Sequence, residues 1–203
     1  MLNFLLGALI LVPGSADVTQ AAVAVEVQPS TDSVAQRAAM RGFSMCLAKA
    51  RPRWARETLA HPYLSKAQAS TAAEALAGTD LCIRGPEADL TFRTSALIGS
   101  LAEHFIAARG DRVDLHRLAD SLEAIKPLNA SEDFALCVTV RDPAAARALA
   151  LSQPGSDAEA DAARKLARGI APCVIAGEKP VVELQSLRSL VSVALYRGLT
   201  NGG

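Results

Sequence analysis

Residues 134–173 read FALCVTVRDPAAARALALSQPGSDAEADAARKLARGIAPC, and they carry several helix start and stop signals between two cysteines. Asp142-Pro143 places a capping side chain directly before a proline in the first turn of a helix. Ser156-x-x-Glu159 is typical of a capping box ahead of an alanine-rich helix. Gly169 stands where that helix is expected to end. The stretch therefore predicts two helices.

The same arrangement occurs 91 residues earlier, in residues 43–82, which read FSMCLAKARPRWARETLAHPYLSKAQASTAAEALAGTDLC. A shift of 91 residues superimposes both cysteines, a phenylalanine, a proline, an Ala-Arg pair and a glycine. It also pairs Ser65-x-x-Gln68 with Ser156-x-x-Glu159. Because one register matches so many different residue types, we predict a tandem duplication into modules of about 90 residues.

The four cysteines form two equally spaced pairs, and the members of each pair are 36 positions apart in the sequence. Four cysteines allow three connectivities. A duplicated module should keep its own bond, which predicts Cys46–Cys82 and Cys137–Cys173. Zinc or redox chemistry is the competing interpretation, but the chain has no C-x-x-C pair.

Composition and hydrophobic spacing predict an all-α fold of two helical modules, each with an internal disulfide. Half of the residues are hydrophobic and only 4% are aromatic, which favours closely packed helices. The apolar pairs near residues 23–27 and 181–182 are too short to predict strands. The expected helices cover about 33–50, 92–108, 114–125, 131–141 and 182–197, besides the alanine-rich ones. We expect module 1 with an inter-module helix over 25–126, and module 2 over 127–203.

The N-terminus predicts an export signal in residues 1–24. Leu2 to Val12 is an apolar run of signal-peptide length that ends at Pro13. Small-residue patterns allow cleavage after Ala16 or Ala24. No lysine or arginine precedes the run, and a buried N-terminal helix is the alternative. We expect a periplasmic or secreted chain with no transmembrane segment in its mature part.

A further pattern joins these features: a cysteine, an R-x-P or D-P step, an alanine-rich helix, G-x-x-x-C and a final leucine-rich helix. In the second module these are Cys137, Asp142-Pro143, Gly169 to Cys173 and Leu195-Tyr196-Arg197. The pattern resembles a group of uncharacterised exported proteins of Gram-negative bacteria. The first module differs at its end, with Glu103-His104-Phe105. The resemblance implies this fold and no particular activity.

Motifs for catalysis and cofactors are missing from the sequence. There is no G-x-S-x-G, no glycine-rich phosphate-binding motif, no H-E-x-x-H and no calcium loop. We therefore expect no cofactor and no metal. Lysine plus arginine balance aspartate plus glutamate at 21 each, which argues against nucleic-acid binding.

Four residues remain as candidates for a functional surface. Arg56 and Arg147 occupy equivalent places in the two modules, either as a duplicated anion site or as structural helix arginines. Trp54 has no aromatic counterpart and is either a partner anchor or buried. His104 beside Glu103 is either a general base or a surface histidine. The RPRWAR segment at 51–56 is a basic cluster with one aromatic residue. It either contacts an anionic envelope lipid or a polyanion or, as we expect, forms a solvated helix face.

The leading hypothesis is an exported binding or interaction protein that contacts an envelope protein or component. Two alternatives stay open: a small exported hydrolase that uses His104 with Glu103, and a carrier with an apolar pocket between the modules. Enzymatic activity is not expected, although the sequence does not decide it. The oligomeric state is open as well.

Overall fold

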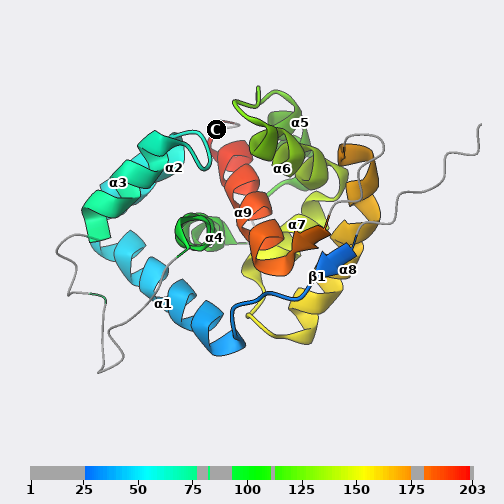
Figure 1. Ribbon diagram of the computed structural model, residues 1–203. Coiled ribbons are helices and arrows are strands. Elements are labelled where there is room, and N and C mark those ends of the chain that lie inside the picture. Colours follow the sequence, from blue (N-terminus) through cyan, green and yellow to red (C-terminus); the bar gives the residue numbers. More distant parts are fainter. Residues whose placement is uncertain (1–25, 77–81, 83–92, 111–112, 175–180, 202–203) are drawn as a thin grey trace, which may run out of the picture.

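The computed structural model describes residues 26–76, 82, 93–110, 113–174 and 181–201 (Figure 1). Within these ranges the chain is all-α, as predicted, with nine α-helices and two strands of three residues each. The predicted leader, residues 1–24, lies outside the described residues. No helix among the described residues has the length and apolar character needed to cross a bilayer.

The helices follow one another in two similar series with one helix between them. The first series is α1 (Val34–Ala50), α2 (Pro52–Ala60), α3 (Lys66–Leu76) and α4 (Thr94–Arg109). The intervening helix is α5 (Leu115–Glu123). The second series is α6 (Ala130–Arg141), α7 (Pro143–Leu151), α8 (Asp157–Ile170) with the 3-10 turn η2 (Ala171–Cys173), and α9 (Leu184–Asn201).

Several helices begin where the capping signals predict. The side chain of Asp142 accepts a hydrogen bond from the Ala145 N–H at the start of α7. Ser156 caps α8 by accepting the N–H of Glu159, but the Glu159 carboxylate reaches the N–H of Gly155, one residue before the expected partner. Gly169 was expected to end α8 and instead lies inside it, because η2 continues the turn. Gly78 lies outside the described residues.

The two series share a local detail that the duplication predicts. Leu64 and Gly155 are 91 residues apart, and both have a positive φ, of 60° and 78°. Each precedes the serine that caps the next helix. Gln68 also reaches back to the Leu64 N–H, as Glu159 does to that of Gly155. The duplication itself stays a prediction.

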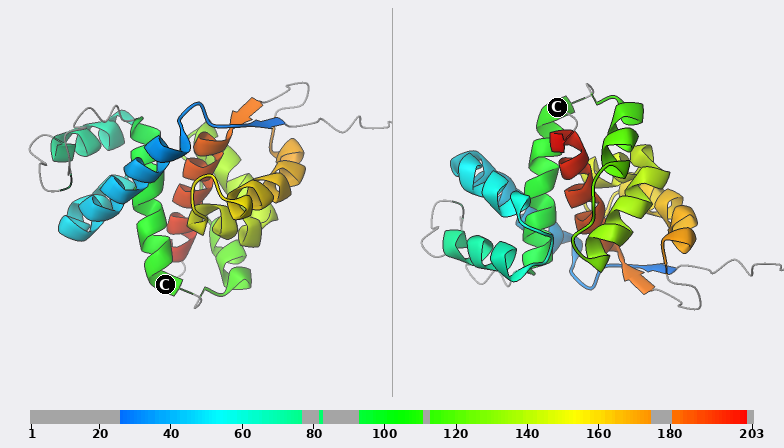
Figure 2. Two further views of the ribbon diagram at one scale, coloured as in Figure 1. Left: turned by 90° about the horizontal axis from the view of Figure 1, so that it is seen from below. Right: turned by 90° about the horizontal axis from the view of Figure 1, so that it is seen from above.

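Helices α4 and α9 lie side by side at the centre of the molecule (Figures 1 and 2). Helices α1 to α3 lie on one side of this pair, and α5 to α8 lie on the other. The two helices approach closely at Gly99, where an added Cβ would lie 2.6 Å from the Cα of Ser189. A hydrophobic cluster fills the space on each side of the central pair.

The inter-module helix α5 packs with the second series. Its Leu118 and Leu122 are buried in the same cluster as Leu149, Leu166 and residues of α9. In return, Val193 of α9 belongs to the cluster of α1 to α4. The sequence break at 126–129 does separate α5 from α6, but the cores do not divide there.

A short parallel pairing joins the start of the described chain to the segment just before α9. Strand β1 (Glu26–Gln28) pairs with β2 (Val181–Glu183), with Val27 opposite Val182. The expectation that these apolar pairs form no strand is wrong, and α9 begins at Leu184 rather than at Val182. Each segment alone is too short to be recognised, because its partner lies about 150 residues away in sequence.

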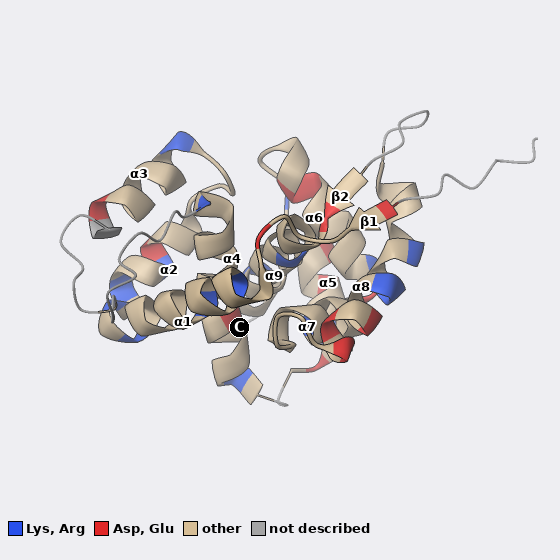
Figure 3. Ribbon diagram, turned by 60° about the horizontal axis from the view of Figure 1, so that its bottom comes forward, with Lys and Arg blue, Asp and Glu red and all other residues tan. Residues whose placement is uncertain are grey.

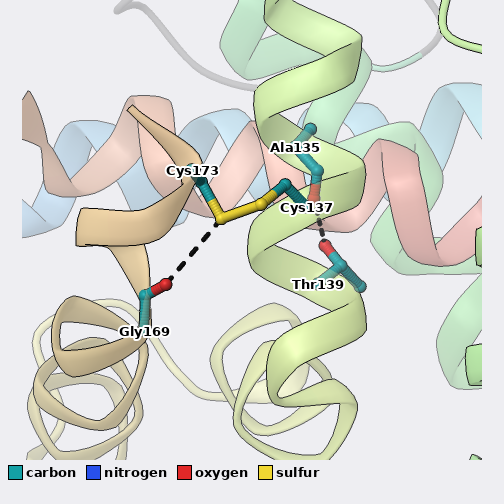
Figure 4. Close-up of a disulfide and its surroundings, with 5 residues drawn as sticks. All are labelled: Ala135, Cys137, Thr139, Gly169 and Cys173. Carbon is teal, nitrogen blue, oxygen red and sulfur yellow. Dashed lines mark hydrogen bonds between the residues drawn. A yellow bond between two sulfur atoms is a disulfide. The ribbon is translucent and has the colours of Figure 1, made fainter. Parts of the chain in front are cut away.

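Both predicted disulfides are present. Cys46 bonds Cys82 and Cys137 bonds Cys173, with the same Cα–Cα distance of 5.7 Å. Figure 4 shows Cys137 on α6 reaching Cys173, which follows the end of α8. Each bond fastens the first helix of a series to the chain after its third helix.

Candidate functional site

Trp54 has a structural position in the first series. Its indole Nε1 donates a hydrogen bond to the carbonyl oxygen of Thr71, at 2.8 Å. The ring is half-buried against the cluster of α1 to α4. Trp54 therefore holds α2 against α3, which is the structural alternative of the sequence analysis.

Arg56 and Arg147 are not in equivalent surroundings. Arg147 donates from Nη2 to the carbonyl oxygen of Gly110, at 2.8 Å, and so contacts the residue that ends α4. Arg56 is exposed, and its Cζ lies 5.3 Å from the centre of the Phe105 ring. The structure does not bring the two arginines together.

His104 and Glu103 face different surroundings on α4. Neighbouring residues of a helix point about 100° apart. The Glu103 side chain is 2% exposed and is occupied by arginines, whereas His104 is half-buried beside Phe105. Burial lowers the pKa of His104, and the nearby Lys49 lowers it further. The acid–base pair that a hydrolase would need is not assembled.

Glu103 belongs instead to a buried ionic cluster, which we define as Arg37, Arg41, Glu103, Glu159 and Arg188. Arg188 of α9 donates from Nε and Nη2 to the two oxygens of Glu103, at 2.6 and 3.0 Å. Its Nη1 reaches Glu159 of α8 at 3.0 Å. From α1, Arg37 pairs with Glu159 at 2.6 Å and Arg41 with Glu103 at 3.1 Å. The cluster thus joins α1, α4, α8 and α9.

The cluster also receives the C-terminal end of α7. Arg188 donates to the carbonyl oxygens of Ala150 and Ser152, and Arg41 donates to that of Ser152. These carbonyls have no partner within the helix and form the negative end of its dipole. Three arginines and two glutamates leave one positive charge in excess, and the helix end offsets it. The cluster is therefore complete without a bound anion.

Pairing favours the ionised forms of Glu159 and Arg188, whereas burial dominates at Glu103, whose pKa is raised, and at Arg41, whose pKa is lowered. Burial raises the pKa of Glu159, but the hydrogen bonds from Arg37 and from the Gly155 N–H outweigh it and hold that pKa below its ordinary value. Burial lowers the pKa of Arg188, but its bond to Glu103 outweighs this and raises it. Because both carboxylates are closed off by guanidinium groups, we assign the cluster a scaffolding role.

Glu132 makes a second buried junction on the other face of α9. Its two oxygens accept the N–H groups of Tyr63 and Leu128, at 2.6 and 2.9 Å. Arg197 pairs with Glu132 at 2.9 Å and donates to the carbonyl oxygen of His61, just after α2. Arg188 and Arg197 are nine residues apart, about two and a half helical turns. Helix α9 therefore binds the end of α7 on one face and the end of α2 on the opposite one.

Cations and aromatic rings meet at the surface where α1, α2, α4 and α9 come together. We call this the basic aromatic face, and it comprises Lys49, Arg53, Arg56, His104, Phe105, Arg109 and Tyr196. The rings of Phe105 and Tyr196 lie 5.6 Å apart, and Arg56 covers Phe105. Arg109 follows Phe105 by four residues, so both lie on one side of α4.

The charged side chains of this face are all basic. Burial raises the pKa of the Tyr196 hydroxyl, although Arg56 and Arg109 oppose that change. The four basic side chains of the face are exposed, and none forms an ion pair with an acidic side chain in the described part of the chain. Within the part of the chain that the structure describes, the face therefore has donors and no carboxylate in contact with them.

The face belongs to a wider charge asymmetry that the zero net charge conceals. Residues 33–66 contain seven lysines and arginines and one acidic residue, Glu57, whereas residues 113–174 contain seven basic and nine acidic residues. Figure 3 shows basic segments along α1 and α2 and acidic segments mostly on the other half. From the sequence, only the net charge of the whole chain was considered, and this asymmetry was therefore missed. The basic RPRWAR segment was the one part of it that the sequence analysis noted.

Two hollows lined by described residues bear on ligand binding. A cavity between the two series, lined by Tyr63, Leu136, Leu190 and Val193 among others, has a volume of only about 10 Å³, which is about the space of one water. A shallow groove of about 460 Å³ lies beside the ends of α4 and α9, with Arg109, Asp114 and Arg117 on its walls. The small cavity does not provide the pocket that an apolar-ligand carrier requires.

Comparisons with protein-family models, with curated proteins and with solved structures find no match to this chain. The resemblance to exported helical proteins of Gram-negative bacteria accordingly stays a prediction.

Proposed function

We propose that this chain is an exported binding protein that contacts an envelope protein or component through the basic aromatic face. The observation that carries the proposal is the contact of Arg56 with the Phe105 ring beside Tyr196. Exposed cations surround it, and none of them forms an ion pair with another described residue. Arginine and aromatic side chains are the residues most enriched at the energetic centres of protein interfaces.

The two disulfides support the exported location. Structural disulfides persist in oxidising compartments and are rare in the cytosol. An apolar run of signal-peptide length precedes the described residues, and either proposed cleavage site would leave β1 in the mature chain. Intact mass and non-reducing peptide mapping of the exported protein test this part. A chain that retains Met1 and four free thiols would contradict it.

The binding surface is tested by site-specific photocrosslinking. A photoreactive residue replaces Arg53, which is exposed on α2, and a matched control replaces Lys165, which is exposed on α8. We expect a discrete crosslinked product from position 53 in the envelope fraction and none from position 165. The product should disappear when Arg56 and Arg109 are both changed to glutamate. Identical products from both positions, or a product indifferent to the two changes, would refute the proposal.

The hydrolase remains the weaker alternative, because its only support was the adjacency of Glu103 and His104. The structure occupies Glu103 with Arg188 and Arg41.

A further inference from the structure

The proposed function leaves open what the basic aromatic face recognises. We infer that it binds an acidic polypeptide segment, whose carboxylates pair with Arg56 and Arg109 while an apolar or aromatic side chain packs beside Phe105 and Tyr196. This inference rests on the proposed function and assigns the chemistry of the partner.

The first argument is the state of the arginine donors. The guanidinium carbon of Arg56 lies over the Phe105 ring, 5.3 Å from its centre, and this contact uses none of the N–H groups of the arginine. A guanidinium carries five N–H donors and no acceptor. No hydrogen bond or ion pair consumes those of Arg56 among the described residues. A guanidinium whose donors are free matches a carboxylate, which accepts two parallel hydrogen bonds.

The second argument is the mixture of charge and ring surface. Phe105 and Tyr196 are half-buried and come from different helices, α4 and α9. Their contact at 5.6 Å leaves a small apolar surface between Arg56 and Arg109. A partner that offers carboxylates alone would leave these rings in contact with water. A polypeptide segment offers carboxylates and apolar side chains at neighbouring positions.

The third argument weighs a polypeptide against a lipid surface, which also presents anions. Binding at a membrane interface is strengthened by exposed apolar side chains that enter the bilayer. The exposed large hydrophobic residues of the described chain belong to other segments than α2, α4 and α9, and none lies on this face: Val34, Leu64, Leu115, Leu128 and Val181. Among the described residues, the face therefore has cations and two half-buried rings, with no exposed large apolar side chain to enter a bilayer.

The inference also predicts the strength of the salt dependence. The attraction comes from exposed charges, which are screened over about 10 Å at 0.1 M salt. Raising the salt concentration should therefore weaken the charge contribution to binding, while the contribution of the apolar contacts should persist. A ligand held only by charge would be lost altogether.

The test measures fluorescence anisotropy with the disulfide-bonded mature chain. The probe is a labelled 12-residue peptide of glutamates interrupted by tyrosine and leucine, and the control probe has glutamine in place of each glutamate. We expect the glutamate peptide alone to bind at 50 mM NaCl. The double variant Arg56→Gln/Arg109→Gln should weaken binding by about tenfold or more, since two charge-assisted contacts are lost. The matched variant Arg164→Gln/Arg168→Gln, with its changes on α8, should bind as the unmodified chain does.

Three results would overturn the inference: equal binding of both peptides, no effect of the Arg56→Gln/Arg109→Gln variant, or tighter binding to phosphatidylglycerol vesicles than to the glutamate peptide. Thermal unfolding of both double variants checks that they fold. If crosslinking through position 53 succeeds while the glutamate peptide fails to bind, the proposed function stands and the assigned partner chemistry is wrong. If crosslinking fails while the glutamate peptide binds, the face recognises acidic segments, but the proposed function in the envelope is wrong.

Discussion

Replacing Arg188 by methionine is the sharpest test of the buried ionic cluster. Methionine keeps much of the length of the side chain and removes its donors. The change takes away both bonds to Glu103, the bond to Glu159 and the bonds to the carbonyl oxygens of Ala150 and Ser152. Arg41 and Arg37 still contact the two carboxylates, so neither is left entirely without a cation.

The expected cost follows from the burial of these groups. The side chains of Arg188, Glu103 and Glu159 are all 2% exposed. Removing one partner of a buried ion pair costs about 3–5 kcal/mol, because the other charge stays buried. This is a large share of a typical unfolding free energy of about 5–15 kcal/mol. For a chain of this length it corresponds to a decrease in Tm of about 6–20 °C.

Urea unfolding followed by circular dichroism, without reductant, measures the effect. The control is Arg164→Met, which removes an exposed pair with Asp161 on α8 and should change the unfolding free energy by less than about 0.5 kcal/mol. Adding Glu103→Met to Arg188→Met should recover part of the loss, because it removes one of the buried charges left behind. If Arg188→Met costs no more than Arg164→Met, the cluster does not hold the helices together as we argue.

Three further predictions concern packing, covalent links and pH. Gly99→Ala should lower the unfolding free energy by about 1–3 kcal/mol, since the added methyl group would collide with Ser189 where α4 meets α9. The control Gly42→Ala has open space around the methyl group and should raise the unfolding free energy by about 0.5–1 kcal/mol. Equal effects of the two changes in urea unfolding would refute the close approach of α4 and α9. Changing both Cys137 and Cys173 to serine should lower the unfolding free energy by about 4 kcal/mol, the chain-entropy value for a loop of this length. A decrease below about 1 kcal/mol would show that the loop is constrained even without the disulfide. The pKa of Glu159 is held below its ordinary value in the folded chain. The contribution of Glu159 to stability should therefore be complete above about pH 4.5 and be lost as the pH falls through the lowered pKa. Between pH 6 and pH 3, the urea midpoint should decrease less steeply in Glu159→Gln than in the unmodified chain.

Local signals account for most of the helices and for both disulfides. Asp142 and Ser156 cap the helices that follow them because such caps depend on residues three positions away. The equal spacing of the cysteines was enough to predict their pairing. The strands at 26–28 and 181–183 were missed for the opposite reason, since each depends on a distant partner.

The candidate site was less accessible to sequence reasoning, because its partners come from distant parts of the chain. Glu103 looked like a companion for His104, its neighbour, but it pairs with Arg188, 85 residues away. Arg37 and Arg41 are four residues apart on α1 and share one side of it. That pair is a signal in the sequence that could have indicated a buried acidic partner. For Arg56, sequence reasoning found the residue but not the Phe105 ring beneath it.

The placement of the two ionic junctions bears on how the basic aromatic face is held. Arg188 and Arg197 fasten opposite faces of α9 to the ends of α7 and α2. Tyr196 adjoins Arg197 on α9, and Arg56 lies on the same α2 helix whose end Arg197 binds. The helices that carry Arg56 and Tyr196 are therefore fastened to each other, and binding a partner need not bring α2 and α9 together first. A surface that is ordered in advance loses less entropy on association, so even a small group of cations and rings can support specific binding.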